Sequence, residues 1–263
     1  MQARAYRTIL ASSDARGIAT ITLNVPERKN PIGPLMVNEL LYALDDAKED
    51  PNVRVIVLTG AGAAFSAGGD LKQMAGAGGD GPALPPRGDY ADLLLRFPKL
   101  GKPTIARIPG VAMGGGLGLV ASCDFAIACE SAVFGTPEIK RGLFPMMIMA
   151  VLQRVVSRRR LLEMMLLGEK ITARQAAEIE LITRAVPDEA LDAEVDALAA
   201  KLAAQSPTAM RMGLAAYHAQ ADRTLEEALP HLQEQLAAIL GTEDAREGLA
   251  AFLEKRAPRW TGR

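Results

Sequence analysis

The sequence predicts an α/β fold followed by a helical C-terminal region, and three observations carry that prediction. Residues 19–25 alternate apolar and polar side chains with a period of two, which is typical of a half-buried strand. Residues 53–59 (VRVIVLT) form a continuous, largely β-branched run before Gly60, the pattern of a strand covered on both faces. After Pro145, apolar side chains recur mainly at helical spacing to the end of the chain.

Further elements follow in the same order. Asn30 and Pro31 are expected to be the N-cap and the first residue of a helix between the first two strands. Residues 103–108 and 124–129 are short apolar runs that we interpret as two more strands. Later helices are expected to begin near Thr172, Pro187, Ser206, Thr224 and Thr242.

Composition excludes several classes of function. The 263 residues carry 30 Lys and Arg against 31 Asp and Glu, so bulk electrostatics gives no reason to expect a nucleic-acid or lipid partner. Two Cys and two His argue against a disulfide framework and a zinc site. The N-terminus lacks the apolar core of a secretory signal, and residues 143–152, the longest strongly apolar run, fall short of the roughly 20 residues that span a bilayer. We therefore expect a cytoplasmic protein that binds no metal, nucleic acid or membrane.

Two glycine-rich turns, at residues 65–72 (FSAGGDLK) and 114–118 (GGGLG), each follow a predicted strand. Glycine lets backbone N–H groups approach a ligand closely, so two such turns could together stabilise an oxyanion. For either turn alone, tight packing of a helix on a strand is the favoured explanation. A dinucleotide site is disfavoured because Leu119 stands where G-x-G-x-x-G requires glycine.

Glu138 follows the predicted strand at 124–129 and lies beside an apolar set at residues 144–147. Such surroundings should disfavour the ionised carboxylate and raise its pKa toward the range that serves proton transfer. The alternative is an ordinary solvated glutamate on a turn. Residues 74–89 are rich in Gly and Pro and form either an interdomain linker or a mobile loop at a site. The strand signal that resumes at 103–108 favours the loop.

Six stretches stand in a specific order along the chain: GIATITLNVPERKN, VRVIVLTGAGAAFSAGGDLKQM, KPTIARIPGVAMGGGLGLVASCDFAIA, FGTPEIKRGLFP, GEKITARQAAEIELITRAVP and EDAREGLAAFLEKRAPRWTGR. Through them the chain resembles the crotonase superfamily, the enoyl-CoA hydratase/isomerase family, over nearly its full length. The resemblance implies a crotonase-like (ClpP/crotonase) spiral of ββα units as a core over residues 1–190. It also implies a C-terminal helical region over residues 191–263 that assembles a homotrimer or a homohexamer.

The resemblance also implies a site for an acyl-CoA substrate, with no cofactor beyond the coenzyme A that the substrate carries. The thioester oxygen would be held by the backbone amides of Gly69 and Gly115, one from each glycine-rich turn, and Glu138 would be the acid/base. Coenzyme A would pass Ala67 and Lys72, and Lys255 and Arg256 would reach the coenzyme A of a neighbouring subunit.

Two departures from the family pattern bear on the reaction. Family hydratases usually carry two glutamates, of which the second matches Glu138, whereas the first position is Gly118 here. The amide that positions water in the family would belong to Met146, in an altered segment. The expected activity is enoyl-CoA hydration, with Δ3,Δ2-enoyl-CoA isomerisation by the single glutamate as the alternative. A CoA-thioester binding protein with little catalysis is the third possibility.

Overall fold

Two β-sheets form the core of the protein in a computed structural model, which describes residues 4–74, 76 and 84–263. The larger sheet has the order β1 (Ile9–Ser13), β2 (Ile18–Leu23), β3 (Val55–Gly60), β5 (Thr104–Ile108), β7 (Phe125–Cys129) and β10 (Arg184–Val186). The smaller sheet has the order β4 (Ala64–Ser66), β6 (Val111–Met113), β8 (Val133–Gly135) and β9 (Ile171–Thr172). Among the strands of the described residues, β1 and β9 alone run antiparallel to their neighbours.

The chain alternates between the two sheets. Strands β3, β5 and β7 of the larger sheet are each followed directly by β4, β6 and β8 of the smaller one. Every residue of β3 is buried, as the continuous apolar run predicts for a parallel strand covered on both faces. This repeat is the predicted spiral of ββα units, and it brings the ends of the short strands to one region.

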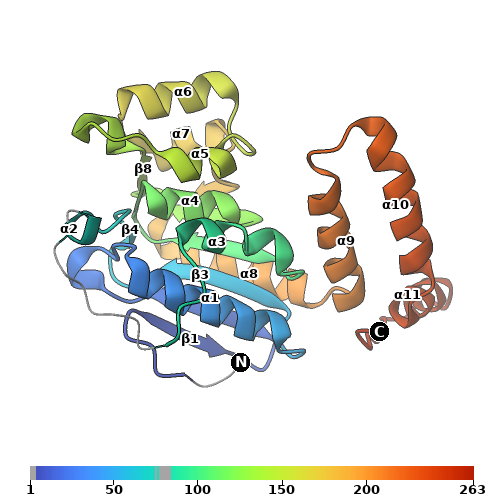
Figure 1. Ribbon diagram of the computed structural model, residues 1–263. Coiled ribbons are helices and arrows are strands. Elements are labelled where there is room, and N and C mark those ends of the chain that lie inside the picture. The colour runs from blue at the N-terminus through green and yellow to red at the C-terminus, as the bar shows by residue number, and fades with distance from the viewer. Residues whose placement is uncertain (1–3, 75, 77–83) are drawn as a thin grey trace.

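Helices surround the sheets and then leave them (Figure 1). They are α1 (Pro34–Glu49), α2 (Leu71–Met74), α3 (Tyr90–Leu94), α4 (Gly115–Ser122), α5 (Met146–Leu152), α6 (Arg158–Leu167), α7 (Ala173–Glu178), α8 (Leu191–Ala203), α9 (Pro207–Gln220), α10 (Leu225–Leu240) and α11 (Glu243–Leu253), with short 3₁₀ helices η1 (Pro26–Arg28), η2 (Phe97–Lys99), η3 (Pro137–Arg141) and η4 (Asp188–Ala190). Figure 1 shows α1 in front of the larger sheet and α8 behind it. Both helices contribute side chains to the hydrophobic core.

The first helix does not begin where the sequence predicts. It starts at Pro34 with Gly33 as N-cap, and Asn30 instead adopts a left-handed conformation with φ of 53°. The amide group of Asn30 is buried and donates to the carbonyl oxygen of Ala64 at 2.9 Å. Asn30 therefore supports β4 and the turn before it rather than capping a helix. Asparagine tolerates this role because it enters the left-handed region more readily than most residues.

The region after Pro145 is less uniformly helical than predicted. Strand β10 follows α7 and pairs in parallel with β7, which extends the larger sheet by one strand. Strand β9 pairs with β8 in the smaller sheet. Both strands have only two or three residues, too few for a period of two to be recognised.

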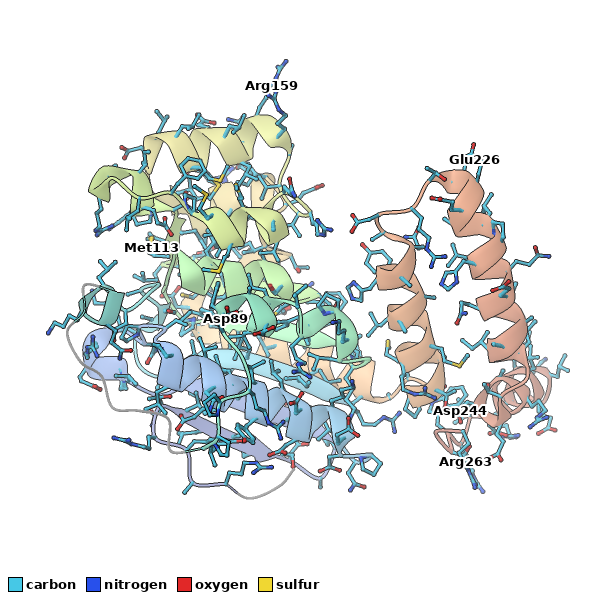
Figure 2. All side chains as sticks on the ribbon, viewed as in Figure 1. Asp89, Met113, Arg159, Glu226, Asp244 and Arg263 are labelled. Atoms are coloured by element: carbon cyan, nitrogen blue, oxygen red, sulfur yellow. The ribbon has the colours of Figure 1, made fainter. Side chains whose placement is uncertain are left out.

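Helices α9–α11 form an arm that projects from the core (Figure 1). Asp244, labelled on this arm in Figure 2, is buried and accepts a hydrogen bond from the hydroxyl group of Ser206 at 2.6 Å. The amide of Thr261 donates to the same carboxylate at 2.7 Å. These bonds tie the C-terminal residues back onto the arm. Within residues 4–74, 76 and 84–263, no helix combines the length and the apolar character needed to cross a membrane.

Candidate active site

The first glycine-rich turn, residues 67–70, joins β4 to α2 and is held by the segment before α1. The amide of Ile32 donates to the carbonyl oxygen of Gly68 at 2.8 Å, and the amide of Asp70 donates to the carbonyl oxygen of Ile32 at 3.0 Å. Burial opposes ionisation of Asp70, but hydrogen bonds from Arg28 and from the first amides of α2 outweigh burial and lower its pKa. The ionised carboxylate therefore fixes the turn.

The second glycine-rich turn, residues 114–116, joins β6 to α4. Gly114 has φ of 48°, in the left-handed region that favours glycine. A Cβ atom on Gly114 would lie only 2.6 Å from Oε1 of Glu138. The amide of Gly114 donates to the carbonyl oxygen of Gly135, at the end of β8, at 3.0 Å. The glycine thus allows both the turn and the approach of the glutamate.

The structure brings the two predicted amides together. A Cβ atom on Gly115 would lie 3.6 Å from the amide nitrogen of Gly69. Gly115 is the first residue of α4, so its amide has no acceptor within the helix. Across the described residues, no backbone acceptor is found for either amide. Two unpaired donors so close together, one of them at a helix N-terminus, are suited to hold one oxygen on which negative charge develops.

Glu138 lies on η3, directly after β8. The buried hydroxyl group of Thr136 donates to the carbonyl oxygen of Met164 in α6 at 2.9 Å, which fixes the start of this short helix. The Oε2 atom of Glu138 is buried, and the described residues offer it no hydrogen-bond partner. A buried carboxylate oxygen without a partner is costly, so its presence indicates a group that bonds to something the unliganded protein does not supply.

Burial raises the pKa of Glu138 above its ordinary value, although its own backbone amide and the charge of Arg141 oppose the shift. The sequence predicts this upward shift of the Glu138 pKa. The predicted apolar lining is only partly found. Pro145 is buried and Phe144 is half-buried, whereas the side chains of Met146 and Met147 are mostly exposed.

Position 118, on α4, has no room for a side chain. A Cβ atom on Gly118 would lie 2.4 Å from Cγ2 of Ile148 and 2.5 Å from the hydroxyl oxygen of Tyr90. Ile148 is 3% exposed, so it cannot simply turn toward solvent. The glycine is therefore required by packing, and Gly118→Glu could not supply a second carboxylate without displacing Ile148 or Tyr90.

Tyr90 is a residue of this site that the sequence analysis missed. It is the first residue of α3 and donates its hydroxyl group to the carbonyl oxygen of Gly115 at 2.5 Å. Burial, and then the negative charge of Glu138, raise the pKa of Tyr90, so the phenol stays neutral near neutral pH. The sequence signals only that α3 begins here, because Asp89 and Asp92 form a capping box. No pattern relates position 90 to the second glycine-rich turn.

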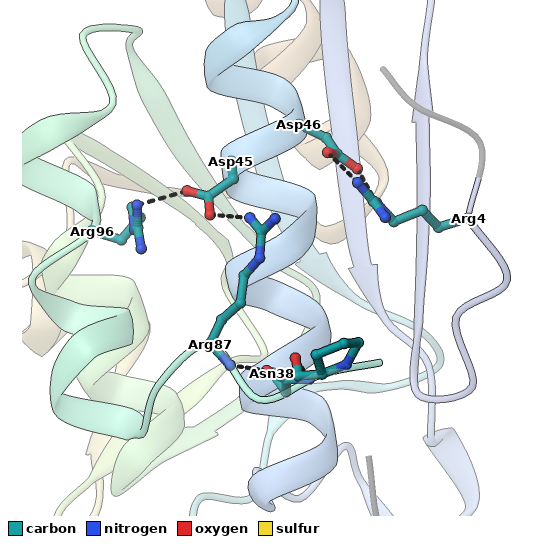
Figure 3. Close-up of polar contacts among 7 residues, drawn as sticks. Arg4, Asn38, Asp45, Asp46, Arg87 and Arg96 are labelled. Carbon is teal, nitrogen blue, oxygen red and sulfur yellow. Dashed lines mark hydrogen bonds and ion pairs between the residues drawn. The ribbon is translucent and has the colours of Figure 1, made fainter. Parts of the chain in front are cut away.

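Ion pairs on both sides of α3 hold this helix against α1 (Figure 3). Arg87, before α3, and Arg96, after it, both pair with Asp45 of α1, the latter at 2.7 Å. The backbone amide of Arg87 donates to Oδ1 of Asn38 at 2.7 Å. The guanidinium group of Arg87 also lies 3.8 Å from the centre of the Tyr42 ring, close enough for a cation–π contact. Three residues of α1 therefore hold the two flanks of α3, and with them Tyr90, in place.

The Gly- and Pro-rich segment, residues 74–89, lies partly outside the described residues. Its described end, residues 84–89, runs along α1 to Asp89, which Figure 2 labels on the core. Strands β3 and β5, on either side of the segment in the sequence, are neighbours in one sheet. The segment is therefore not a linker between two domains.

The predicted coenzyme A residues fall into two groups. Ala67 and Lys72 are exposed at the first glycine-rich turn and at α2. Lys255 and Arg256 lie beyond α11 on the arm, on the other side of the molecule (Figure 1), where Arg256 pairs with two glutamates at 2.6 Å. Within one chain the two groups are not together, and the contact with a neighbouring subunit stays a prediction.

The amide assigned to water by resemblance is already engaged. The backbone N–H of Met146 donates to the carbonyl oxygen of Phe144 at 2.8 Å. Among the described residues, no group of three or more His, Cys, Asp or Glu side chains is placed to hold a metal ion.

Comparisons with known proteins agree with this architecture. The family model for enoyl-CoA hydratase/isomerase matches residues 13–263. A Mycobacterium tuberculosis protein described as a probable enoyl-CoA hydratase is 36% identical over 262 residues, covering 98% of this chain and 99% of the relative. A Xenopus laevis protein, mitochondrial enoyl-CoA hydratase domain-containing protein 3, is 34% identical and covers 93% and 83% of the two chains.

Solved structures agree as well. The crystal structure of enoyl-CoA hydratase from Mycobacterium smegmatis superposes with a TM-score of 0.88 at 34% identity, covering 97% of this chain and 99% of the other. The enoyl-CoA hydratase structure from Bacillus anthracis gives 0.89 at 30% identity, with 98% and 100% coverage. The chain therefore belongs to the enoyl-CoA hydratase/isomerase (crotonase) family, and it has the crotonase fold that the resemblance implied.

Proposed function

We propose that this protein is an enoyl-CoA hydratase, which adds water across the 2,3-double bond of an enoyl-CoA thioester. The observation that carries the proposal is one constellation: the free amides of Gly69 and Gly115 next to Glu138, whose buried oxygen has no partner among the described residues. The enoyl-CoA hydratase names of the relatives support it. The constellation combines the two functions that hydration of a thioester needs, stabilisation of an enolate and transfer of a proton.

In this mechanism the amides of Gly69 and Gly115 donate to the thioester oxygen and stabilise the enolate-like charge that forms when water attacks Cβ. Glu138, as the carboxylate, takes a proton from the attacking water and returns it to Cα. The enclosing side chains make the ionised carboxylate more basic than a solvated glutamate, because water that would stabilise the charge is excluded.

Isomerisation of a 3-enoyl-CoA is the second candidate, and the closed position 118 favours it. A double-bond shift needs one carboxylate, which removes a proton at C2 and returns it at C4. Within the described part of the chain, Glu138 is the carboxylate that lies against the second glycine-rich turn. The remaining possibility, a binding protein with little catalysis, fits the site less well. A pure binder gains nothing from a buried carboxylate oxygen that lacks a partner.

The setting of the site is part of the same proposal. Coenzyme A would run past Ala67 and Lys72, while Lys255 and Arg256 would contact the coenzyme A of a neighbouring subunit in a homotrimer or a homohexamer. The reaction would take place in the cytoplasm and need no metal, redox cofactor or nucleic acid. Acyl-CoA thioesters are the class of substrate that the enoyl-CoA hydratase/isomerase family binds.

Product analysis across a panel of 2-enoyl-CoA and 3-enoyl-CoA thioesters tests the proposal. We expect 3-hydroxyacyl-CoA from the 2-enoyl substrates. Conversion of 3-enoyl into 2-enoyl-CoA with no hydroxyacyl product would establish the isomerase instead. Tight binding without turnover of any thioester would leave only the binding function.

The variant Glu138→Gln should reduce kcat by about 100- to 10,000-fold, the usual contribution of a general acid/base, while binding of a saturated acyl-CoA changes little. Glutamine keeps the shape of the side chain but cannot accept the proton. The matched control is Glu169→Gln, an exposed glutamate that pairs with Lys140 on the surface. Unchanged kcat in the Glu138 variant would remove this residue from the mechanism.

A further inference from the structure

We propose that the hydroxyl group of Tyr90 positions the reacting water against Glu138, at the place that a second carboxylate would otherwise occupy. The inference rests on the proposed hydratase function and adds one residue to it. It assigns a role to a side chain that comes from α3, outside both glycine-rich turns and outside η3.

The location of the hydroxyl oxygen is the first argument. It lies 2.5 Å from where the Cβ atom of a residue at position 118 would be, and 3.6 Å from the corresponding point on Gly115. It therefore occupies the start of the path that a side chain at 118 would follow into the site. Cβ atoms placed on the neighbouring residues Gly114 and Gly115 would lie 2.6 Å from Oε1 of Glu138 and 3.6 Å from the hydroxyl oxygen of Tyr90. Tyr90 and Glu138 thus both lie against the second glycine-rich turn.

The direction of the existing hydrogen bond is the second argument. A tyrosine hydroxyl has one proton to donate and can also accept hydrogen bonds. Tyr90 donates its proton to the carbonyl oxygen of Gly115, so toward any further partner its oxygen acts as an acceptor. A water molecule that donates one O–H to Tyr90 and the other to the unpartnered Oε2 of Glu138 would have its own lone pairs available for attack on the substrate.

The third argument is that the other candidates for this task are occupied or absent. The amide of Met146 already donates to Phe144. Position 118 is closed to any side chain by Ile148 and by Tyr90 itself. A carboxylate without help would orient water poorly, because two contacts define an attack direction better than one.

The step balances with the groups present. The water oxygen forms a bond to Cβ, Glu138 takes one proton of the water, and the π electrons move to Cα and the thioester oxygen held by Gly69 and Gly115. Glu138 then returns the proton to Cα, and the O–H that pointed at Tyr90 becomes the hydroxyl group of the product. Tyr90 keeps its own proton throughout and acts as a positioning residue.

The test compares Tyr90→Phe with the unaltered enzyme in two assays. Hydration of crotonyl-CoA needs a positioned water, whereas exchange of the C2 protons of butyryl-CoA with deuterated solvent needs only Glu138 and the two amides. We expect kcat for hydration to fall by about 10- to 100-fold, as for loss of a hydrogen bond to a reacting group, with KM and the exchange rate nearly unchanged. Tyr217→Phe makes the same chemical change at an exposed position on the arm and should alter neither assay.

Two outcomes would overturn the role of Tyr90 alone. Hydration at the original rate would show that the hydroxyl is dispensable. Equal losses of hydration and of exchange would show that Tyr90 merely supports the backbone of Gly115. If the unaltered enzyme exchanges C2 protons but hydrates no 2-enoyl-CoA, the hydratase proposal itself fails, and the inference with it.

Discussion

At the scale of single residues, Glu138 illustrates how packing sets chemistry. The residue as a whole is half-buried, and its buried Oε2 atom has no hydrogen-bond partner among the described residues. Desolvation raises the pKa of Glu138, while a hydrogen bond from its own backbone amide and the charge of Arg141 lower it. Desolvation dominates, and the result is a stronger base than a surface glutamate.

The pH dependence of the reaction should report this shift. In the proposed mechanism Glu138 must be ionised to take a proton from water. We therefore expect kcat/KM to rise with pH and to level off only above the raised pKa, at higher pH than the ordinary glutamate value of 4.5 would give. The measurement is a pH profile of crotonyl-CoA hydration. An acidic limb centred at or below 4.5 would contradict the expectation.

The same shift has a consequence for stability, with a definite sign. Because the folded protein favours the protonated carboxyl, the contribution of Glu138 to the free energy of unfolding is greatest below the ordinary glutamate pKa. It is lost as the pH rises through the raised folded value. Glutamine at position 138 does not titrate, so the Glu138→Gln variant should lack this pH-dependent loss of stability. Melting temperatures of the variant and the unaltered protein, measured across the same pH window, test the expectation.

At the scale of elements, α3 is a short helix whose position depends on its flanks. Its five residues give few hydrogen bonds of their own, so the pairing of Arg87 and Arg96 with Asp45 is what joins it to α1 (Figure 3). Tyr90 is the first residue of that helix. A shift of α3 would therefore move the hydroxyl group relative to Gly115.

Asp45→Asn should lower the free energy of unfolding by about 1 kcal/mol, because it weakens two partly exposed ion pairs. It should also lower kcat for hydration, by roughly ten-fold, since small displacements of a positioning group are costly. The control is Asp46→Asn, at the next position of α1, whose carboxylate pairs with Arg4 instead (Figure 3). Chemical denaturation and initial rates measure both effects. Equal kcat values in the two variants would argue against a link between α3 and the reaction.

Particular elements show what the sequence could and could not predict. Strands β2, β3, β5 and β7 were predictable because each is long enough to display a pattern of burial. The glycine-rich turns were predictable because glycine marks close approach of backbone. The short strands of the smaller sheet, with two or three residues each, carry no readable period. The contact between Tyr90 and position 118 depends on how α3 and α4 pack, which no local pattern encodes.

At the scale of the whole molecule, the arm of α9–α11 is internally fixed yet apolar outside. Trp260 donates its indole N–H to the carbonyl oxygen of Ala204 at 2.9 Å, and Asp244 binds the C-terminal residues. Many large apolar side chains of α10 and α11 nevertheless remain exposed, namely Leu225, Leu229, Leu236, Leu240, Leu249, Phe252 and Leu253. A rigid arm with such a surface favours contact with further copies of the chain.

The molecular mass in solution, measured by light scattering, is expected to be three or six times that of one chain. Phe252→Asp, which places a charge on a side chain that is 82% exposed in the single chain, should reduce the mass. Leu10→Asp is the control, because Leu10 is 55% exposed but lies on β1 of the core, away from the arm. A monomer in the unaltered protein would contradict both the assembly and the subunit-crossing role of Lys255 and Arg256.

The β-bridge between Ile32 and Gly69 of the first glycine-rich turn shows that the site is assembled from segments far apart in the sequence. The segment before α1 holds the turn that carries one amide, and the end of β8 holds the turn that carries the other. Helix α3, which lies between these segments in the sequence, supplies the phenol. No continuous peptide shorter than the stretch from Ile32 to Glu138 contains all of these parts. The site is therefore indivisible: it exists only once both sheets have assembled, and its chemistry is a property of the folded domain rather than of any motif within it.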